Sequence, residues 1–133
     1  MEAVEMTHEV LGGEGAKAGR ITPTRIGSVA VLAADGEIDL QTASRLHAAL
    51  AEVLEKAHAT AVILDLTEAR FLGSTGIAAL VDAHWQATQL HTPLTIIVTA
   101  RGLVHRALRT AGVDHHLALR FDIAAALREL ETQ

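Results

Sequence analysis

The 133-residue sequence lacks cysteine and tyrosine, and aromatic side chains make up only 2% of it. Without cysteine, the chain can form neither a disulfide framework nor a thiolate metal site. It also lacks the run of about 18 apolar residues that a membrane-spanning helix needs, and its first ten residues carry three glutamates but no basic stretch. We therefore expect a cytoplasmic protein that is not exported and does not associate with membranes.

Positive charge is also scarce. The chain holds 11 lysines and arginines against 16 aspartates and glutamates, which gives a formal net charge of -5. Such a balance offers no electrostatic basis for binding a phosphate backbone, so we do not expect DNA or RNA as a partner. A basic protein surface fits the overall charge better.

The length suits a single domain with one core, and half of the residues are apolar. Residues 1–19 have no sustained hydrophobic period and contain four glycines, so we expect a flexible N-terminal tail there. Residues 20–133 are expected to form the domain.

Apolar periodicity divides the domain into alternating strands and helices. The expected strands lie at 20–26, 29–38, 61–66, 94–99 and about 116–121, and the expected helices follow Asp39, begin at Ser74, span about 102–111 and follow Asp122. The order ββαβαβαβα predicts an α/β fold with a mixed, mainly parallel sheet of four to five strands and about four helices. Functional groups in such sheets gather at the carboxyl ends of the strands.

Two of these helices have apolar stripes that we expect to face the core. In the helix that begins at Ser74, the expected inward stripe is Ile77, Leu80, Val81, His84 and Thr88. In the helix at about 102–111, it is Leu103, Ala107, Leu108 and Ala111. The basic side of that second helix, with Arg101, His105, Arg106 and Arg109, is interpreted as a solvated face, and docking of an acidic partner is the alternative.

Ser74, in the segment FLGSTGI (71–77), allows three interpretations. It can be an N-cap that accepts a backbone hydrogen bond at the helix start. It can be a hydrolase nucleophile, for which Asp82, Asp114 and His115 are nominal partners, but the G-x-S-x-G pattern is broken by Leu72. It can also be a phosphate acceptor, because the amino terminus of a helix favours an anion.

Three segments together resemble the STAS family, in particular its bacterial anti-sigma factor antagonists. They are GEIDLQTA (36–43), VILDLTEARFLGSTGIAAL (62–80) and GVDHHLALRFDIAAAL (112–127), and the resemblance covers about residues 20–131. It implies a STAS-type fold and a partner that is both an anti-sigma factor and an ATP-dependent serine kinase. It further implies that the unmodified protein binds this partner and frees a sigma factor, that phosphorylation breaks the complex, and that a phosphatase restores it.

By position, the resemblance makes Ser74 the phosphorylation site, with Thr75 as the second choice. The expected partner-binding residues are Glu37, Asp39, Gly73, Ser74, Thr75 and Gly76, and Asp39 has helix capping as an equal alternative role. The family usually has an aspartate before the acceptor serine, where this chain has Gly73. This departure keeps open a phosphorylation-independent STAS module that binds a sensor, a transporter subunit or a small ligand.

Eight histidines, including the pair in DHH (114–116), raise the question of a metal site. No compact ligand motif such as H-E-x-x-H occurs, and neighbouring side chains on an extended segment point to opposite faces. We therefore expect no metal, no cofactor and no catalytic residues.

Overall fold

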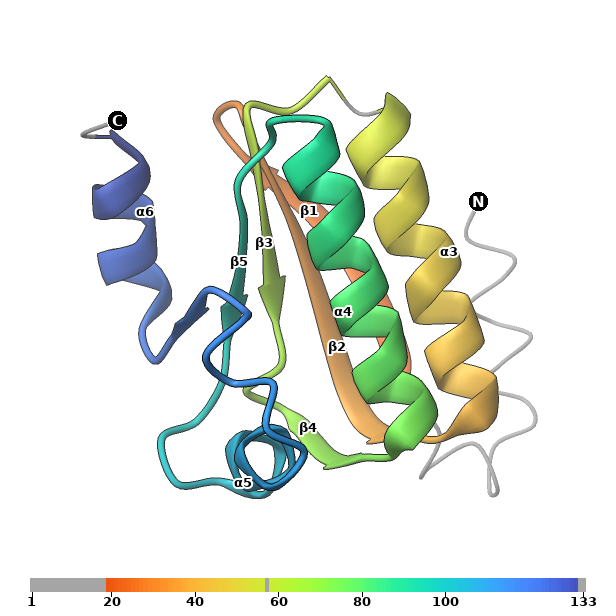
Figure 1. The fold of residues 1–133 in the computed structure, drawn as a ribbon. Coiled ribbons are helices and arrows are strands. Elements are labelled where there is room, and N and C mark those ends of the chain that lie inside the picture. Colours follow the sequence, from red (N-terminus) through yellow and green to blue (C-terminus); the bar gives the residue numbers. More distant parts are fainter. Residues whose placement is uncertain (1–18, 57, 132–133) are drawn as a thin grey trace.

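The computed structural model describes residues 19–56 and 58–131, which form one α/β unit (Figure 1). Its elements, in chain order, are β1 (Arg20–Ile26), β2 (Val29–Ile38), α3 (Leu40–Lys56), β3 (Ala61–Asp65), β4 (Ala69–Leu72), α4 (Ser74–Gln89), β5 (Leu94–Ile97), α5 (Leu103–Thr110), β6 (Leu119–Arg120) and α6 (Ile123–Glu131). None of the helices in this part of the chain has the length and apolar character needed to cross a bilayer.

The sheet has the order β1-β2-β3-β5-β6, and all its pairs are parallel except the β1–β2 hairpin. Pro23 lies in the edge strand β1. Proline has no N–H group to donate, and an edge strand tolerates this better than a central one. Gly27 makes the hairpin turn with φ 61°, a conformation that glycine adopts at little cost. The predicted α/β class, the mainly parallel sheet and the four helices are confirmed.

The sheet has six strands rather than the expected four to five, because β4 was not among the strands expected from the apolar pattern. This strand has only four residues, and it pairs with the end of β2 beyond the part that β3 occupies. Arg70 and Phe71 are exposed, so β4 lacks the buried apolar run by which β3 and β5 are recognised.

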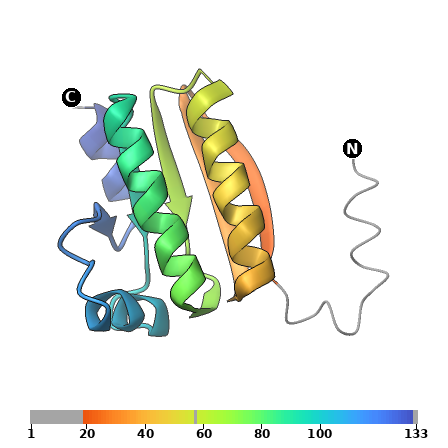
Figure 2. The same ribbon diagram turned by 45° about the vertical axis from the view of Figure 1, so that its right-hand side comes forward.

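Helices cover both faces of the sheet. In both views α3 and α4 lie side by side across one face (Figures 1 and 2), and they enclose the larger core with alternate strand residues such as Leu32, Val62 and Leu64. On the opposite face, Ala126 of α6 packs with Val31, Ile63 and Ile97. The helix α5 contacts β4 and lies at the lower end of the sheet in Figure 1.

The expected inward stripe of α4 was partly wrong. Leu80 is buried and the half-buried Ile77 packs against the core, as expected, but Val81 and His84 are only half-buried and Thr88 is exposed. The remaining buried residues of α4 are small: Gly76, Ala79, Ala83 and Ala87. Small side chains let the helix approach the sheet and α3 closely, whereas the sequence pattern drew attention to the large ones.

The stripe of α5 also differs from the expectation. Leu108 is buried, but the second buried residue is Val104, while Leu103 is 63% exposed. Ala107 is half-buried and Ala111 is exposed. The helix ends before Gly112, whose φ of 77° fits the glycine expected after a helix C-terminus.

The predicted tail, residues 1–19, lies outside the described residues except for Gly19. This glycine is buried, and its carbonyl oxygen accepts a hydrogen bond of 2.9 Å from the Arg45 guanidinium. A Cβ atom at Gly19 would lie 2.6 Å from Thr42 Cγ2 and 2.8 Å from the Asp35 carbonyl oxygen, so the tight contact requires glycine.

Candidate functional site

The long strand β2 organises the candidate site at the carboxyl edge of the sheet. Its first half pairs with β3, and its last residues pair with β4 after a register shift between Gly36 and Glu37. The backbone N–H of Gly73 then donates a hydrogen bond of 3.3 Å to the Ile38 carbonyl oxygen. The start of α4 is therefore held directly beside the end of β2 and the start of α3.

Ser74 is the first residue of α4, and Gly73 occupies the N-cap position with an extended backbone (φ -85°, ψ -179°). No side chain caps this helix start. The interpretation of Ser74 as the N-cap is therefore wrong, because the helix begins one residue earlier than a serine cap requires. Ser74 is exposed, and within the described residues its hydroxyl makes no hydrogen bond.

Asp39 does cap a helix, and it lies at the same edge. Its Oδ1 atom accepts a hydrogen bond of 3.0 Å from the Thr42 backbone N–H, in the first turn of α3. This backbone hydrogen bond is the main reason why the pKa of Asp39 lies below its ordinary value, because it stabilises the charged form. The neighbouring Glu37 is half-buried and lies opposite Phe71 in the β2–β4 register.

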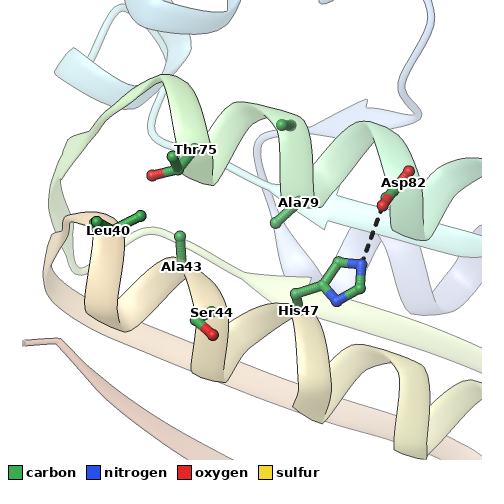
Figure 3. A pocket seen from close by; sticks show the side chains of 8 residues that line it. Leu40, Ala43, Ser44, His47, Thr75, Ala79 and Asp82 are labelled. Carbon is green, nitrogen blue, oxygen red and sulfur yellow. Dashed lines mark hydrogen bonds and ion pairs between the residues drawn. The ribbon is translucent and has the colours of Figure 1, made fainter.

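Thr75 is exposed and faces a groove of about 250 Å³ between α3 and α4 (Figure 3). Ala43 and Ala79 contribute to its lining, and a hydrogen bond of 3.1 Å between His47 Nε2 and Asp82 Oδ2 joins the two helices there. Gly76 lies on the inner side of the same turn and is buried. A Cβ atom at this position would lie only 2.5 Å from Leu72 Cδ1, so the close packing favours glycine. Gly76 thus serves the packing of α4 against β4.

The six residues expected to bind a partner are therefore gathered at one edge, four of them consecutive in the chain. Asp39, Ser74 and Thr75 are exposed, Glu37 and Gly73 are half-buried, and Gly76 is buried. Two exposed apolar residues nearby were not among the expected site residues: Leu40 (70% exposed) at the start of α3 and Phe71 (51% exposed) in β4. Both occur within the quoted motifs, and an apolar side chain at a helix or strand end is the signal that could have identified them.

The groups expected for a hydrolase do not converge on Ser74. Asp82 is paired with His47, and Asp114 lies 3.8 Å from its own neighbour His115, whose side chain is 89% exposed. Within the part of the chain that is described, no hydrogen bond joins Ser74 to a histidine. No group of three or more histidine, aspartate or glutamate side chains in residues 19–56 and 58–131 is arranged to hold a metal ion.

The family model of the STAS domain matches residues 20–129, which is most of the chain. The chain belongs to the STAS domain family. It is 38% identical over 87 residues to the anti-sigma-F factor antagonist RsfB of Mycobacterium tuberculosis, in a match that covers 65% of this chain and 68% of that protein.

Solved structures share this STAS fold. An anti-sigma factor antagonist from Mycobacterium paratuberculosis superposes with a TM-score of 0.77 at 23% identity, covering 86% of this chain and 96% of that one. The antagonist SpoIIAA in its unphosphorylated form superposes with a TM-score of 0.69 at 12% identity, covering 84% and 97%. Bacillus SpoIIAA in its phosphorylated form gives a TM-score of 0.62 at 12% identity, covering 82% and 98%. At these identities the likeness shows the fold alone.

Proposed function

We propose that this STAS domain is an anti-sigma factor antagonist that is switched by phosphorylation at Ser74. It binds an anti-sigma factor of the serine-kinase type through Glu37, Asp39 and residues 73–76, and so releases a sigma factor. The observation that carries the proposal is the exposed hydroxyl of Ser74, without a hydrogen-bond partner in the described chain, at the first position of α4.

The relatives support a binding role rather than catalysis. The name of RsfB describes an antagonist of an anti-sigma factor, and the match to it includes more than two thirds of that protein. The exposed side chains at the edge, Asp39, Ser74 and Thr75, lie close enough in the fold to contact one partner surface. The protein then acts in the cytoplasm, where a kinase and a phosphatase set its modification state.

The geometry at α4 explains how a phosphoryl group would act. It would add about two negative charges and three acceptor oxygens to an exposed surface. The first N–H groups of α4 have no side-chain cap, so the charge would meet the positive end of the helix without unfolding it. The domain would stay folded, while an acidic partner surface would be repelled and an apolar one could not cover the hydrated charge.

A second candidate function, a STAS module that binds its partner without phosphorylation, is favoured by one observation. Gly73 occupies the position before the serine at which members of the resembled family usually have an aspartate, so no carboxylate precedes Ser74 in the chain. A small ligand fits this second function less well than a protein, because the groove of about 250 Å³ is smaller than the 300–1,000 Å³ typical of ligand pockets.

The test is to incubate the purified protein with candidate kinase-type anti-sigma factors and ATP, and to map added phosphate by mass spectrometry. We expect phosphate on Ser74, and loss of the partner in pull-downs with Ser74→Glu but not with Ser74→Ala. If no phosphate appears on Ser74 or Thr75 and both variants bind as wild type, the switch is wrong and the phosphorylation-independent module takes its place.

A further inference from the structure

Four arginines lie on neighbouring elements next to the proposed docking edge. Arg70 is in β4, Arg101 precedes α5, and Arg106 and Arg109 are in α5, which contacts β4. All four side chains are exposed, and none of them forms an ion pair with another described residue. We call these four residues the arginine face. By contrast, Arg120 is paired with Glu129 at 3.0 Å.

The arginine face stands out against the charge of the whole chain. Residues 98–113 contain three arginines and no aspartate or glutamate, although the chain as a whole has a net charge of -5. Unpaired arginines on a helix repel one another slightly, since like charges three or four residues apart destabilise it. Arg109, in the last turn of α5, is mildly favoured by the helix dipole, but three arginines without an acidic residue in 98–113 also suit a negatively charged partner.

The backbone that presents the arginine face is fixed. Val104 and Leu108 of α5 are buried, at 3% and 0% exposure. Arg101 has a left-handed backbone (φ 63°), and its N–H donates a hydrogen bond of 3.1 Å to His105 Nδ1. The His105 ring in turn packs edge-on against Phe121, with ring centroids 5.1 Å apart. Little backbone freedom would be lost on binding, which favours recognition by this surface.

Exposed apolar side chains accompany the arginines. Leu103 is 63% exposed, Phe121 54% and Phe71 51%. Arginine together with aromatic residues is the composition enriched at protein–protein interfaces. A nucleic acid fits less well, because the remaining surface is acidic overall and would repel a polyanion outside this patch.

We propose that the arginine face docks an acidic segment of the partner protein. This inference rests on the proposed function and names the chemistry of the partner's contact. β4, which carries Arg70, leads directly through Gly73 into α4, and α5 contacts β4, so the arginine face lies on the elements next to the start of α4. A phosphoryl group on Ser74 would repel the same acidic segment, which gives the switch its direction.

The first experiment compares full-length variants in binding to a purified kinase-type anti-sigma factor by calorimetry at low and high salt. The variant Arg106→Gln/Arg109→Gln should bind about tenfold more weakly at low salt, and its affinity should depend less on salt. The matched control is Arg128→Gln, an exposed arginine of α6, which packs on the opposite face of the sheet, and it should bind as wild type. Equal affinities for the double variant and wild type would overturn the inference.

A second experiment separates this inference from the proposed function. Binding of a fluorescein-labelled glutamate-rich peptide, and of an RNA oligonucleotide of equal charge, is measured by anisotropy on wild type and the double variant. Peptide binding that the double variant loses supports the arginine face even where no anti-sigma factor binds. No peptide binding to wild type, or tighter binding of the RNA, overturns it, whereas the Ser74 switch is judged separately by Ser74→Glu. Thermal unfolding of each variant confirms that it is folded.

Discussion

The two helices that cover one face of the sheet begin side by side but in different ways. At α3, the Asp39 carboxylate accepts the Thr42 N–H and caps the helix. At α4, Gly73 provides no cap, and Ser74 presents a hydroxyl without a partner. Capping contributes to stability, so an uncapped start beside a capped one indicates that the first turn of α4 is not optimised for stability. We interpret the Asp39 cap as stabilising the start of α3, and the uncapped start of α4 as the proposed site of modification.

The largest stability effect within this comparison is expected from removing the existing cap. Asp39→Ala leaves the Thr42 N–H without its acceptor and should lower Tm by about 4 °C in thermal unfolding. The control Asp39→Asn retains a neutral acceptor, so its Tm should lie between those of Asp39→Ala and wild type. Equal Tm values for Asp39→Ala and wild type would remove the distinction between the two helix starts.

The same cap should make stability depend on pH. The pKa of Asp39 is lowered from 3.8 in the folded protein, so its contribution is fully present above 3.8 and is lost as pH falls through the lower folded value. The Tm difference between wild type and Asp39→Ala should therefore be constant down to about pH 5 and shrink below 3.8. A difference that grows on acidification would show that the Asp39 charge does not stabilise the fold.

A smaller effect is expected from giving α4 the cap it lacks. Gly73→Asp should raise Tm by about 1 °C, because aspartate exceeds glycine at an N-cap by only a few tenths of a kcal/mol. A Cβ atom there would lie 3.3 Å from Phe71 Cε2, and the exposed ring has room to move. The control Gly73→Ala adds the same Cβ without a carboxylate and should lower Tm, so a rise with both variants would exclude capping as the cause.

The smallest effect concerns Ser74 itself. Ser74→Ala should change the free energy of unfolding by less than about 0.5 kcal/mol in urea denaturation, because the side chain is exposed and unbonded. A loss of about 1 kcal/mol or more would instead mark Ser74 as a structural cap. This variant therefore tests, without any partner protein, whether the Ser74 side chain stabilises the start of α4.

Much of this arrangement could be predicted from the sequence, for identifiable reasons. Apolar runs located β3 and β5, and capping by Asp39 was one of its two expected roles. The last helix was expected to follow Asp122, which accepts the Ala125 N–H at 3.1 Å. The strand β4 could not be recognised, because its pairing depends on how β2 extends beyond β3. The start of α4 at Ser74 was predicted correctly, but the interpretation of Ser74 as the cap was wrong, since Gly73 and Ser74 are both acceptable N-cap residues by type.

The charge of the partner stays a prediction. From the sequence, the net charge favoured a basic partner, while the basic side of the helix at about 102–111 left an acidic one open, and the fold places that acid-free segment beside β4. Net charge averages over surfaces that contact different partners. The topology, which brings α5 against β4, therefore says more about the local charge than the net charge does.

The central claim is tested most directly by one calorimetric comparison. The affinity of the cognate kinase-type anti-sigma factor is measured for the unmodified protein and for the same protein phosphorylated on Ser74. We predict a loss of about a hundredfold or more on phosphorylation, as expected when an uncompensated charge enters a contact surface. Equal affinities for the two forms would contradict the account.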